Sequence, residues 1–387
     1  MERVVLPNGL VLVLDRFSWP TVALAVGVGV GSLYEGREMR GATHFLEHML
    51  FRVPGLDVDA AVESLGGEHN AYTQRDSIIL IYEALSESAA DLVELAYRMY
   101  VNDKFEEGDL ERERAAVLSE LRQSREDPSS RVGELVLRAL FGGSDWGDPV
   151  GGVPEVVEAL SLKDLAEHRA KWFTPDNTMV VLSGGFSDDV VKKAVELFGR
   201  LDGKAPSKPT PSAGVGPGVI EEVGDVEGVY YAKALRLQVD APTSLYALLH
   251  GAAFHLEVGA KSILFHTVRD GGVAYSYYVD YDVVGDVAYL AVAVESARGL
   301  AAARKAVADA LRPREPPPYR LKFYKYTWEK WWRSPINRAT AVAEYLFKGG
   351  DPGHMEEEFK KAAERGTSWL PPYVAKEAEA AVVPSNH

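Results

Sequence analysis

Two histidines four residues apart, with a glutamate directly before the second, lie in the nonapeptide THFLEHMLF, residues 43–51. Residues four apart on a helix sit one above the other, so His44 and His48 can point two imidazoles at one zinc ion. Glu47 flanks the same face, where its carboxylate can act as a base toward water whose pKa zinc lowers to about 7. The alternative is an ordinary helix turn that holds three polar residues.

A third ligand is needed, because catalytic zinc sites usually take three protein ligands and keep one position open. The chain has no cysteine, so any further ligand is His, Asp or Glu. The segment ERERAAVLSELRQ, residues 111–123, offers Glu113 and Glu120, which are two helical turns apart and share a face. Spacing alone does not choose between them. By itself such a charge run is more typical of a solvated helix face. Its interpretation as a source of a metal ligand is supported by the histidine motif in the same chain.

The elements that must position these residues follow from periodicity and turn signals. Residues 2–15 predict two strands around a Pro-Asn-Gly turn, residues 21–36 a buried strand, and residues 68–85 two further strands. The histidine motif itself requires a helix. Further helices are predicted at 57–67, 88–102, 106–127, 161–173 and 187–201, with a strand at 177–186 before the last.

A break in composition divides the chain. Residues 202–218 are dense in Pro, Gly, Ser and Ala and predict a linker between a domain at 1–201 and another at 219–387. The stretches beginning at Leu65 and Arg269 both run from Gly-Gly through two aromatic-bearing strands to an Ala-rich helix, which indicates a duplicated unit. The predicted fold class is α+β, with two homologous domains, each an antiparallel-rich β-sheet flanked by α-helices.

Composition narrows the function classes. The 387 residues carry a formal net charge of −15, which argues against nucleic acid as a partner. No apolar run is long enough for a membrane span, and the N-terminal segment resembles a strand more than an export signal, so we expect a cytoplasmic protein. Few methionines and no cysteine weakly indicate a thermophilic source. The basic, aromatic residues 312–335 are expected to pack on their own domain or on a partner subunit rather than on nucleic acid.

Several motifs occur together in one order: Gly41 through His48, then Asn-Ala-Tyr-Thr at 70–73, then Glu113 through Glu120. This series resembles the pitrilysin-type (inverzincin, M16-like) zinc metallopeptidases, in their short two-domain prokaryotic form similar to the beta subunit of mitochondrial processing peptidase. The gap between His48 and Glu120 is a few residues shorter than in that family, and the shortening falls before the Asn-Ala-Tyr-Thr stretch. The resemblance implies zinc ligands at His44, His48 and Glu120, a general base at Glu47, and a supporting glutamate at Glu113.

The same resemblance implies how a substrate is held. Asn70, Ala71 and Tyr72 match the edge strand on which family members lay a peptide, a mode in which backbone hydrogen bonds supply the affinity. The segment VRDGGVAYS, residues 268–276, is similar to a family motif whose arginine and tyrosine stabilise the substrate carbonyl and the developing oxyanion. Arg269 and Tyr275 would fill these roles, although they are one residue closer together than in the usual motif.

These observations predict a zinc endopeptidase that hydrolyses peptides or unfolded polypeptide segments, with one Zn²⁺ per chain. The family encloses its substrate in a chamber of four such domains, and this chain supplies two, so a dimer is implied. A homodimer is favoured because the chain carries both the zinc motif and the Arg/Tyr pair. The alternatives are the zinc subunit of an obligate heterodimer with a paralogue, and a non-catalytic scaffold or processing-type subunit with the same fold.

Overall fold

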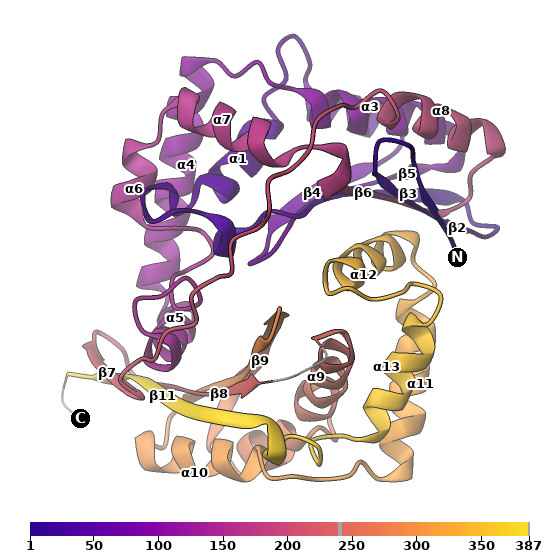
Figure 1. Cartoon of the computed structure of the whole chain (residues 1–387). Helices are drawn as coiled ribbons and strands as arrows, with labels where there is room; N and C mark the ends of the chain where they lie inside the picture. Colours follow the sequence, from indigo (N-terminus) through magenta and orange to yellow (C-terminus); the bar gives the residue numbers. More distant parts are fainter. Residues whose placement is uncertain (239–241, 386–387) are drawn as a thin grey trace.

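The computed structural model describes residues 1–238 and 242–385, and it contains two β-sheets (Figure 1). The first sheet has the strand order β1-β2-β6-β3-β5-β4. Its strands are β1 (Glu2–Val5), β2 (Val11–Arg16), β3 (Thr21–Val28), β4 (Glu68–Thr73), β5 (Ile78–Leu85) and β6 (Thr178–Gly184). The second has the order β7-β11-β8-β10-β9. Its strands are β7 (Val219–Gly224), β8 (Val229–Gln238), β9 (Ala274–Val284), β10 (Val287–Ser296) and β11 (Val374–Pro384).

The two sheets repeat one topology. When β7 to β11 are matched in chain order to β2 to β6, the spatial orders become identical. The pair β2/β6 is parallel, as is β7/β11, and the other pairs in both sheets are antiparallel. The predicted fold of two homologous, antiparallel-rich α+β units is thus confirmed. One consequence for the site is that β4 and its counterpart β9 both lie at a sheet edge.

Helices fill most of the connections between the strands. The first part of the chain contains α1 (Ala42–Leu50), α2 (Val58–Ser64), α3 (Ala89–Val101), α4 (Glu107–Glu126), α5 (Pro128–Phe141), α6 (Pro154–Ala159), α7 (Leu162–Trp172) and α8 (Asp188–Phe198). The second contains α9 (Pro242–Glu257), α10 (Leu300–Ala310), α11 (Pro318–Trp331), α12 (Pro335–Phe347) and α13 (Met355–Glu364). The sequence patterns did not predict α5, α6, α9, α12 or α13.

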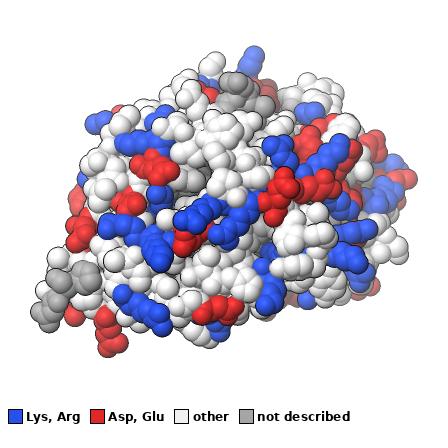
Figure 2. Space-filling view, turned by 90° about the horizontal axis from the view of Figure 1, so that it is seen from below, with Lys and Arg blue, Asp and Glu red and all other residues white. Residues whose placement is uncertain are grey.

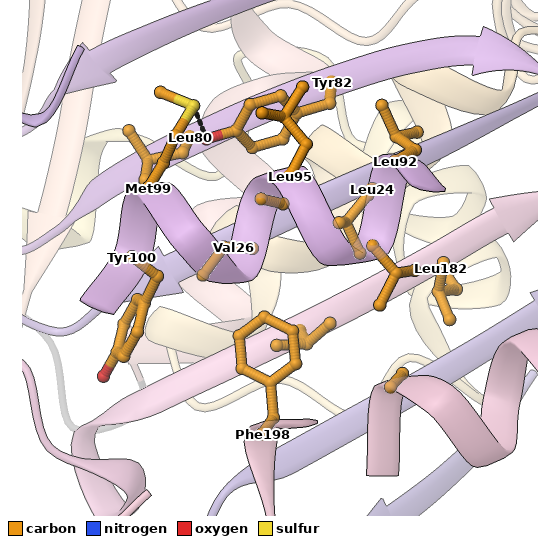
Figure 3. Close-up of a cluster of buried hydrophobic side chains, with 14 of the residues drawn as sticks. Leu24, Val26, Leu80, Tyr82, Leu92, Leu95, Met99, Tyr100, Leu182 and Phe198 are labelled. Carbon is orange, nitrogen blue, oxygen red and sulfur yellow. Dashed lines mark hydrogen bonds between the residues drawn. The ribbon is translucent and has the colours of Figure 1, made fainter. Parts of the chain in front are cut away.

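The core of the first part lies between its sheet and the helices α3 and α8. Strand alternation sends Leu24, Val26 and Leu80 into this layer, where they meet Leu92 and Phe198 (Figure 3). One polar atom in the cluster is satisfied internally, because the Tyr82 hydroxyl donates to Met99 Sδ at 3.3 Å. In the second part, α9 and α10 cover the equivalent face of the second sheet.

The opposite faces of the two sheets are covered by exchanged helices. Helix α12, from the second part, packs on β3, β5 and β6 of the first sheet, while α5, from the first part, packs on β8, β10 and β11 of the second (Figure 1). The receiving faces are lined by small residues, Ala23, Ala25 and Gly27 in the first sheet, which let a helix approach closely. A Cβ atom at Gly27 would lie 2.7 Å from the Phe347 ring. The two parts are therefore interlocked.

Ion pairs reinforce this exchange. Lys348, which follows α12, is almost fully buried and donates to Asp76 at 2.6 Å and to Asp282 at 2.8 Å, so it joins the two sheets. Arg338 of α12 forms a two-pronged pair with Asp15 of β2. Removing one partner of such buried pairs leaves an uncompensated charge, which is strongly destabilising.

Residues 201–217 carry no helix or strand, yet they run along the end of α5 rather than away from the protein. Gly216 N–H donates to Leu140 C=O at 3.1 Å, and Ser212 N–H donates to the Asp145 carboxylate at 2.6 Å. The Pro-rich segment therefore separates the two sheets along the chain. However, α5 and α12 each pack on the sheet of the other part of the chain. The domain bounds predicted from composition therefore separate the two sheets but do not separate all of the helix contacts.

The basic, aromatic segment forms α11, which packs on its own part of the chain through Tyr324 and Trp328. Trp328 stacks on Trp332, with ring centroids 4.9 Å apart. Seen from below, Lys and Arg side chains are interspersed with Asp and Glu side chains over the face in view (Figure 2). None of the helices in the described residues has the length and apolar character to cross a membrane.

Candidate metal centre

The helix that carries the histidine motif begins at a glycine. Gly41 has φ +98°, a left-handed conformation that favours glycine, and a Cβ atom there would lie 2.8 Å from Gly151 C=O. The buried Glu35 carboxylate accepts from the N–H groups of Gly41 at 2.8 Å and Thr43 at 2.6 Å, so it satisfies donors that the first helical turn leaves unpaired. Burial raises the pKa of Glu35 to about 7, although those hydrogen bonds oppose the shift.

Two imidazoles and one carboxylate converge on a point between α1 and α4. Glu120 Oε2 lies 3.6 Å from His44 Nε2 and 3.6 Å from His48 Nε2. The three atoms that could bind a metal lie within 4.8 Å of one another, and this is the one such group among the described residues. Two imidazole nitrogens with one carboxylate oxygen form a typical donor set for a catalytic zinc ion. The residues present therefore fit zinc.

Glu113 supports one of these imidazoles from behind. His48 Nδ1 lies 3.1 Å from Glu113 Oε2, so the Nδ1–H can donate to the carboxylate while Nε2 keeps its lone pair for a metal. Arg52 Nε donates to the other Glu113 oxygen at 2.6 Å. Glu113 is only 6% exposed, and its two partners account for both oxygens. The two glutamates that spacing left open are thus placed differently: one faces both Nε2 atoms, and the other orients His48.

The environment keeps the other histidine neutral. Burial, and secondarily the neighbouring His48, lower the pKa of His44 to about 4. A neutral imidazole is the form that binds a metal. The backbone of Gly151 lies beside the ring, close enough that a Cβ at this position would be 3.7 Å from His44 Nδ1.

Glu47 faces the space next to these ligands and is held by a hydroxyl. Thr73 Oγ1 donates to Glu47 Oε2 at 2.7 Å. Burial raises the pKa of Glu47, and the Thr73 hydrogen bond and His48 act in the opposite direction. Glu47 and His48 line a cavity of about 700 Å³ together with Phe51 and the strand residues Asn70 and Ala71. The carboxylate is therefore placed to exchange a proton with a group in this cavity.

The strand beside the cavity is β4, at the edge of the first sheet. Asn70 and Ala71 lie on the cavity, and the exposed Ala71 N–H donates to Asn70 Oδ1 at 2.9 Å. Tyr72 differs from its neighbours, because its side chain lies on the other face of the sheet and its hydroxyl donates to Glu344 of α12. Only the backbone of Tyr72 can contribute to the free edge.

Arg269 and Tyr275 lie together but away from the metal ligands. The Arg269 guanidinium carbon is 4.3 Å from the centroid of the Tyr275 ring, and Tyr275 is 79% exposed. Farther along β9, Tyr278 and Asp280 line a second cavity, of about 400 Å³, with His44 and Glu120. At about 3.3 Å per strand residue, Tyr275 lies about 10 Å before Tyr278. Within one chain, neither Arg269 nor Tyr275 lines this cavity or the cavity that contains Glu47 and His48.

Several residues of the site were not found from the sequence. Thr73 stands in the same Asn-Ala-Tyr-Thr stretch as the predicted substrate strand, but a threonine at a strand end has no pattern of its own. Arg52 contacts Glu113, which lies 61 residues farther along the chain. Glu35 contacts Gly41 and Thr43, which lie 6 and 8 residues farther along. His168 of α7, whose Nε2 lies 2.9 Å from Thr43 Oγ1, fixes the first turn of α1 from a third helix.

Comparisons with known proteins place this site in a family. Residues 11–152 match the family model described as Insulinase (Peptidase family M16), and residues 159–312 match Peptidase M16 inactive domain. An uncharacterized zinc protease of Mycobacterium leprae is 32% identical over 304 residues, which is 75% of this chain and 68% of that protein. Subunit 1 of the mitochondrial cytochrome b-c1 complex of Rattus norvegicus is 31% identical over 47% of this chain and 38% of the subunit.

Solved structures agree on the fold. A crystal structure of a protease from Helicobacter pylori superposes with a TM-score of 0.87 at 19% identity, covering 99% of both chains. The first family match contains all the candidate metal ligands and Glu47, and the second contains the Arg/Tyr pair. With its two matched regions, its zinc-protease relative and its fold, the chain belongs to the peptidase M16 family.

Proposed function

We propose that this protein is a zinc-dependent endopeptidase that hydrolyses peptides or unfolded polypeptide segments. The observation that carries the proposal is the convergence of His44, His48 and Glu120, with His48 also lining the cavity that contains Glu47 and the edge-strand residues Asn70 and Ala71. A metal-binding set, a base and a strand at a sheet edge are three of the parts that hydrolysis of a peptide bond in an extended substrate requires.

Substrate binding follows from the sheet topology. Because β4 is an edge strand, an extended peptide can add to the sheet through main-chain hydrogen bonds. Asn70 and Ala71 would orient the peptide so that one of its bonds lies beside Glu47. Recognition of this kind depends on backbone shape, which suits unfolded segments better than folded proteins.

Bound zinc would supply a Lewis acid for the scissile carbonyl and lower the pKa of water. His44, His48 and Glu120 would hold it, while Glu113 keeps His48 in the tautomer with a free Nε2. Glu47 would take the proton of the attacking water and then donate it to the leaving amine. The Thr73 hydroxyl fixes the Glu47 carboxylate for both steps.

A complete site also requires donors for the oxyanion, and a second copy of the chain is the proposed source. Tyr275 is exposed and stacked with Arg269, and neither residue lines the cavities that contain the metal ligands and Glu47 of their own chain. In a homodimer each chain would present this pair to the site of its partner. A heterodimer with a paralogue is the alternative arrangement.

The scaffold alternative has support from the relative named as subunit 1 of the mitochondrial cytochrome b-c1 complex, because that name denotes a subunit of a larger assembly. The complete set of His44, His48, Glu47, Glu113 and Glu120 favours catalysis, because a purely structural subunit has no need of an oriented His48.

The test begins with the chain purified alone, its zinc content and size measured, and its hydrolysis of an unstructured fluorogenic peptide assayed. We expect zinc near one per chain and a dimer that cleaves the peptide. Glu47→Gln keeps the shape of the side chain and removes its basicity, so zinc should stay while hydrolysis falls by about 10²-fold or more. A folded, zinc-loaded and dimeric wild-type chain without activity would contradict the proposal, as would a Glu47→Gln variant that keeps more than a tenth of it.

A further inference from the structure

The end of the edge strand β4 is hydrogen-bonded to a helix from the second part of the chain, α12, which lies on the face of the sheet opposite α1. Glu344 of α12 accepts a hydrogen bond from the Tyr72 hydroxyl at 3.1 Å and from Gln74 Nε2 at 2.9 Å, both at Oε1. Its other oxygen accepts from the Tyr246 hydroxyl of α9 at 3.1 Å. One partly buried carboxylate thus joins α9 and α12 to the end of the strand on which we propose that substrate binds.

Thr73, the last residue of β4, stands between the two donors Tyr72 and Gln74. Side chains alternate across a strand, so Tyr72 and Gln74 point toward α12 while Thr73 points to the opposite face, toward α1. The packing agrees, because Tyr72 belongs to the apolar layer under α12 and Ala71 to the layer that contains α1. On that opposite face, the Thr73 hydroxyl holds Glu47 at 2.7 Å.

A second contact grips the turn that follows. Lys348, one helical turn after Glu344, donates to Asp76 at 2.6 Å, and Gln74 is itself tied to the turn through Ser77. Figure 1 shows α12 lying against the first sheet, on the side away from α3 and α8. The strand end is therefore fixed on one face by the second part of the chain, and it presents the hydroxyl for the base on the other.

We propose that Glu344 is a positioning residue for Glu47: it holds Tyr72 and Gln74, and through them it fixes the Thr73 hydroxyl that orients the base. This inference rests on the proposed peptidase function. It gives the second part of the chain a role in the site of its own chain, separate from any role of Arg269 and Tyr275 in a partner's site.

The test is a double-mutant cycle on kcat and KM. Glu344→Gln leaves a side chain of the same size with one accepting oxygen, and we expect kcat to fall about tenfold or more, since a misplacement near 1 Å can cost a catalytic group about 100-fold. Thr73→Val should lower kcat as well. In the Thr73→Val background, Glu344→Gln should cost less than about a further twofold, because the two act through one contact. Tyr72→Phe, the mildest change, should lower kcat in the same direction by a smaller factor.

Asp15→Asn is the matched control. It weakens another polar contact between α12 and the first sheet, the pair of Arg338 with Asp15 of β2, without touching β4. We expect this variant to lose stability but to keep kcat within about twofold. Equal losses of kcat in Asp15→Asn and Glu344→Gln would show that Glu344 only docks the helix, and fully multiplicative effects of Glu344→Gln and Thr73→Val would also overturn the proposal.

Hydrogen exchange supplies a readout that does not depend on activity. Residues 68–77 should exchange about tenfold faster in Glu344→Gln than in wild type, and at the wild-type rate in Asp15→Asn. If wild type is inactive but residues 68–77 still exchange faster in Glu344→Gln, the peptidase function is refuted, whereas the role of Glu344 in holding the end of β4 is supported. Unchanged exchange at 68–77 in Glu344→Gln would refute the positioning role whatever the activity.

Discussion

Co-expression of two inactive variants tests whether the site is shared between chains. Glu47→Gln removes the base, and Tyr275→Phe removes a donor to the oxyanion, a loss of about 10²- to 10³-fold in comparable sites. Tyr275 lies outside the cavities that contain the metal ligands and Glu47, about 10 Å along β9 from Tyr278, which lines the cavity with His44 and Glu120. Each chain therefore depends on the phenol of its partner, if the dimer forms as proposed.

The expected recovery follows from counting. Random pairing makes about half of the dimers mixed, and in each mixed dimer one of two sites combines an intact Glu47 with an intact Tyr275, so activity should return to about a quarter of the wild-type value. Differently tagged chains and tandem affinity purification would isolate the mixed dimers, which should show about half of the wild-type activity.

The control pairs Glu47→Gln with Glu120→Gln. Both changes fall in the zinc-binding part, so each site of their mixed dimer lacks one essential group, and activity should stay at the level of the single variants. Mixed dimers of the first pair that are isolated yet inactive would refute the shared site. Recovery in the control pair would show that the two chains do not divide the site in this way.

Three further outcomes are expected. Glu120→Gln should lose zinc far more readily than Glu113→Gln, which should retain most of its metal and lose about 10- to 100-fold in activity, and metal analysis with the reverse ranking would exchange the two assignments. Because burial raises the pKa of Glu35 from 4.5 to about 7, the folded state binds more protons than the unfolded state between these pH values. The stability of wild type relative to Glu35→Gln should therefore fall by about 3 kcal/mol as pH rises from below 4.5 to above 7. Denaturant unfolding at both pH limits measures this difference, and a difference that does not change with pH would refute the assignment. Gly41→Ala should lower the free energy of unfolding by more than about 1 kcal/mol, because of its φ of +98° and the 2.8 Å approach to Gly151, and an unchanged midpoint in denaturant would contradict this reading of the helix start.

Local signals predicted most of the secondary structure. The Pro-Asn-Gly turn is an example: Gly9 has φ +93°, and Gly9 N–H donates to Leu6 C=O at 2.9 Å, so three residues determine the connection from β1 to β2. The exchange of α5 and α12 could not be predicted in this way. An amphipathic helix shows which of its faces is buried but not which of two similar sheets receives it. The alternation of Ala23 and Ala25 with larger residues in β3 is a hint that becomes readable only with the packing known.

In the site, too, local spacing predicted which residues share a helix face, but not the contacts between residues that are distant in the sequence. Helical spacing brings His44 and His48 together and puts Glu113 and Glu120 on one face, but it does not say which carboxylate meets Nε2 and which meets Nδ1. That choice depends on how α4 packs against α1. The hydrogen bonds of Thr73 to Glu47 and of Tyr72 to Glu344 join residues 26 and 272 positions apart, so no local pattern could report them.

The exchanged helices also set an order in which the chain can finish folding during synthesis. All strands of the first sheet have been made once Gly184 is added, but α12, which covers one face of that sheet, begins only at Pro335. At about 5 to 20 residues per second, the ribosome needs about 8 to 30 seconds to make the intervening chain. Throughout that interval the face formed by Ala23, Ala25 and Val181 has no covering helix. A gene fragment ending in the linker would leave this apolar face uncovered for good, so we expect it to aggregate or to bind chaperones rather than to fold as an independent zinc-binding domain.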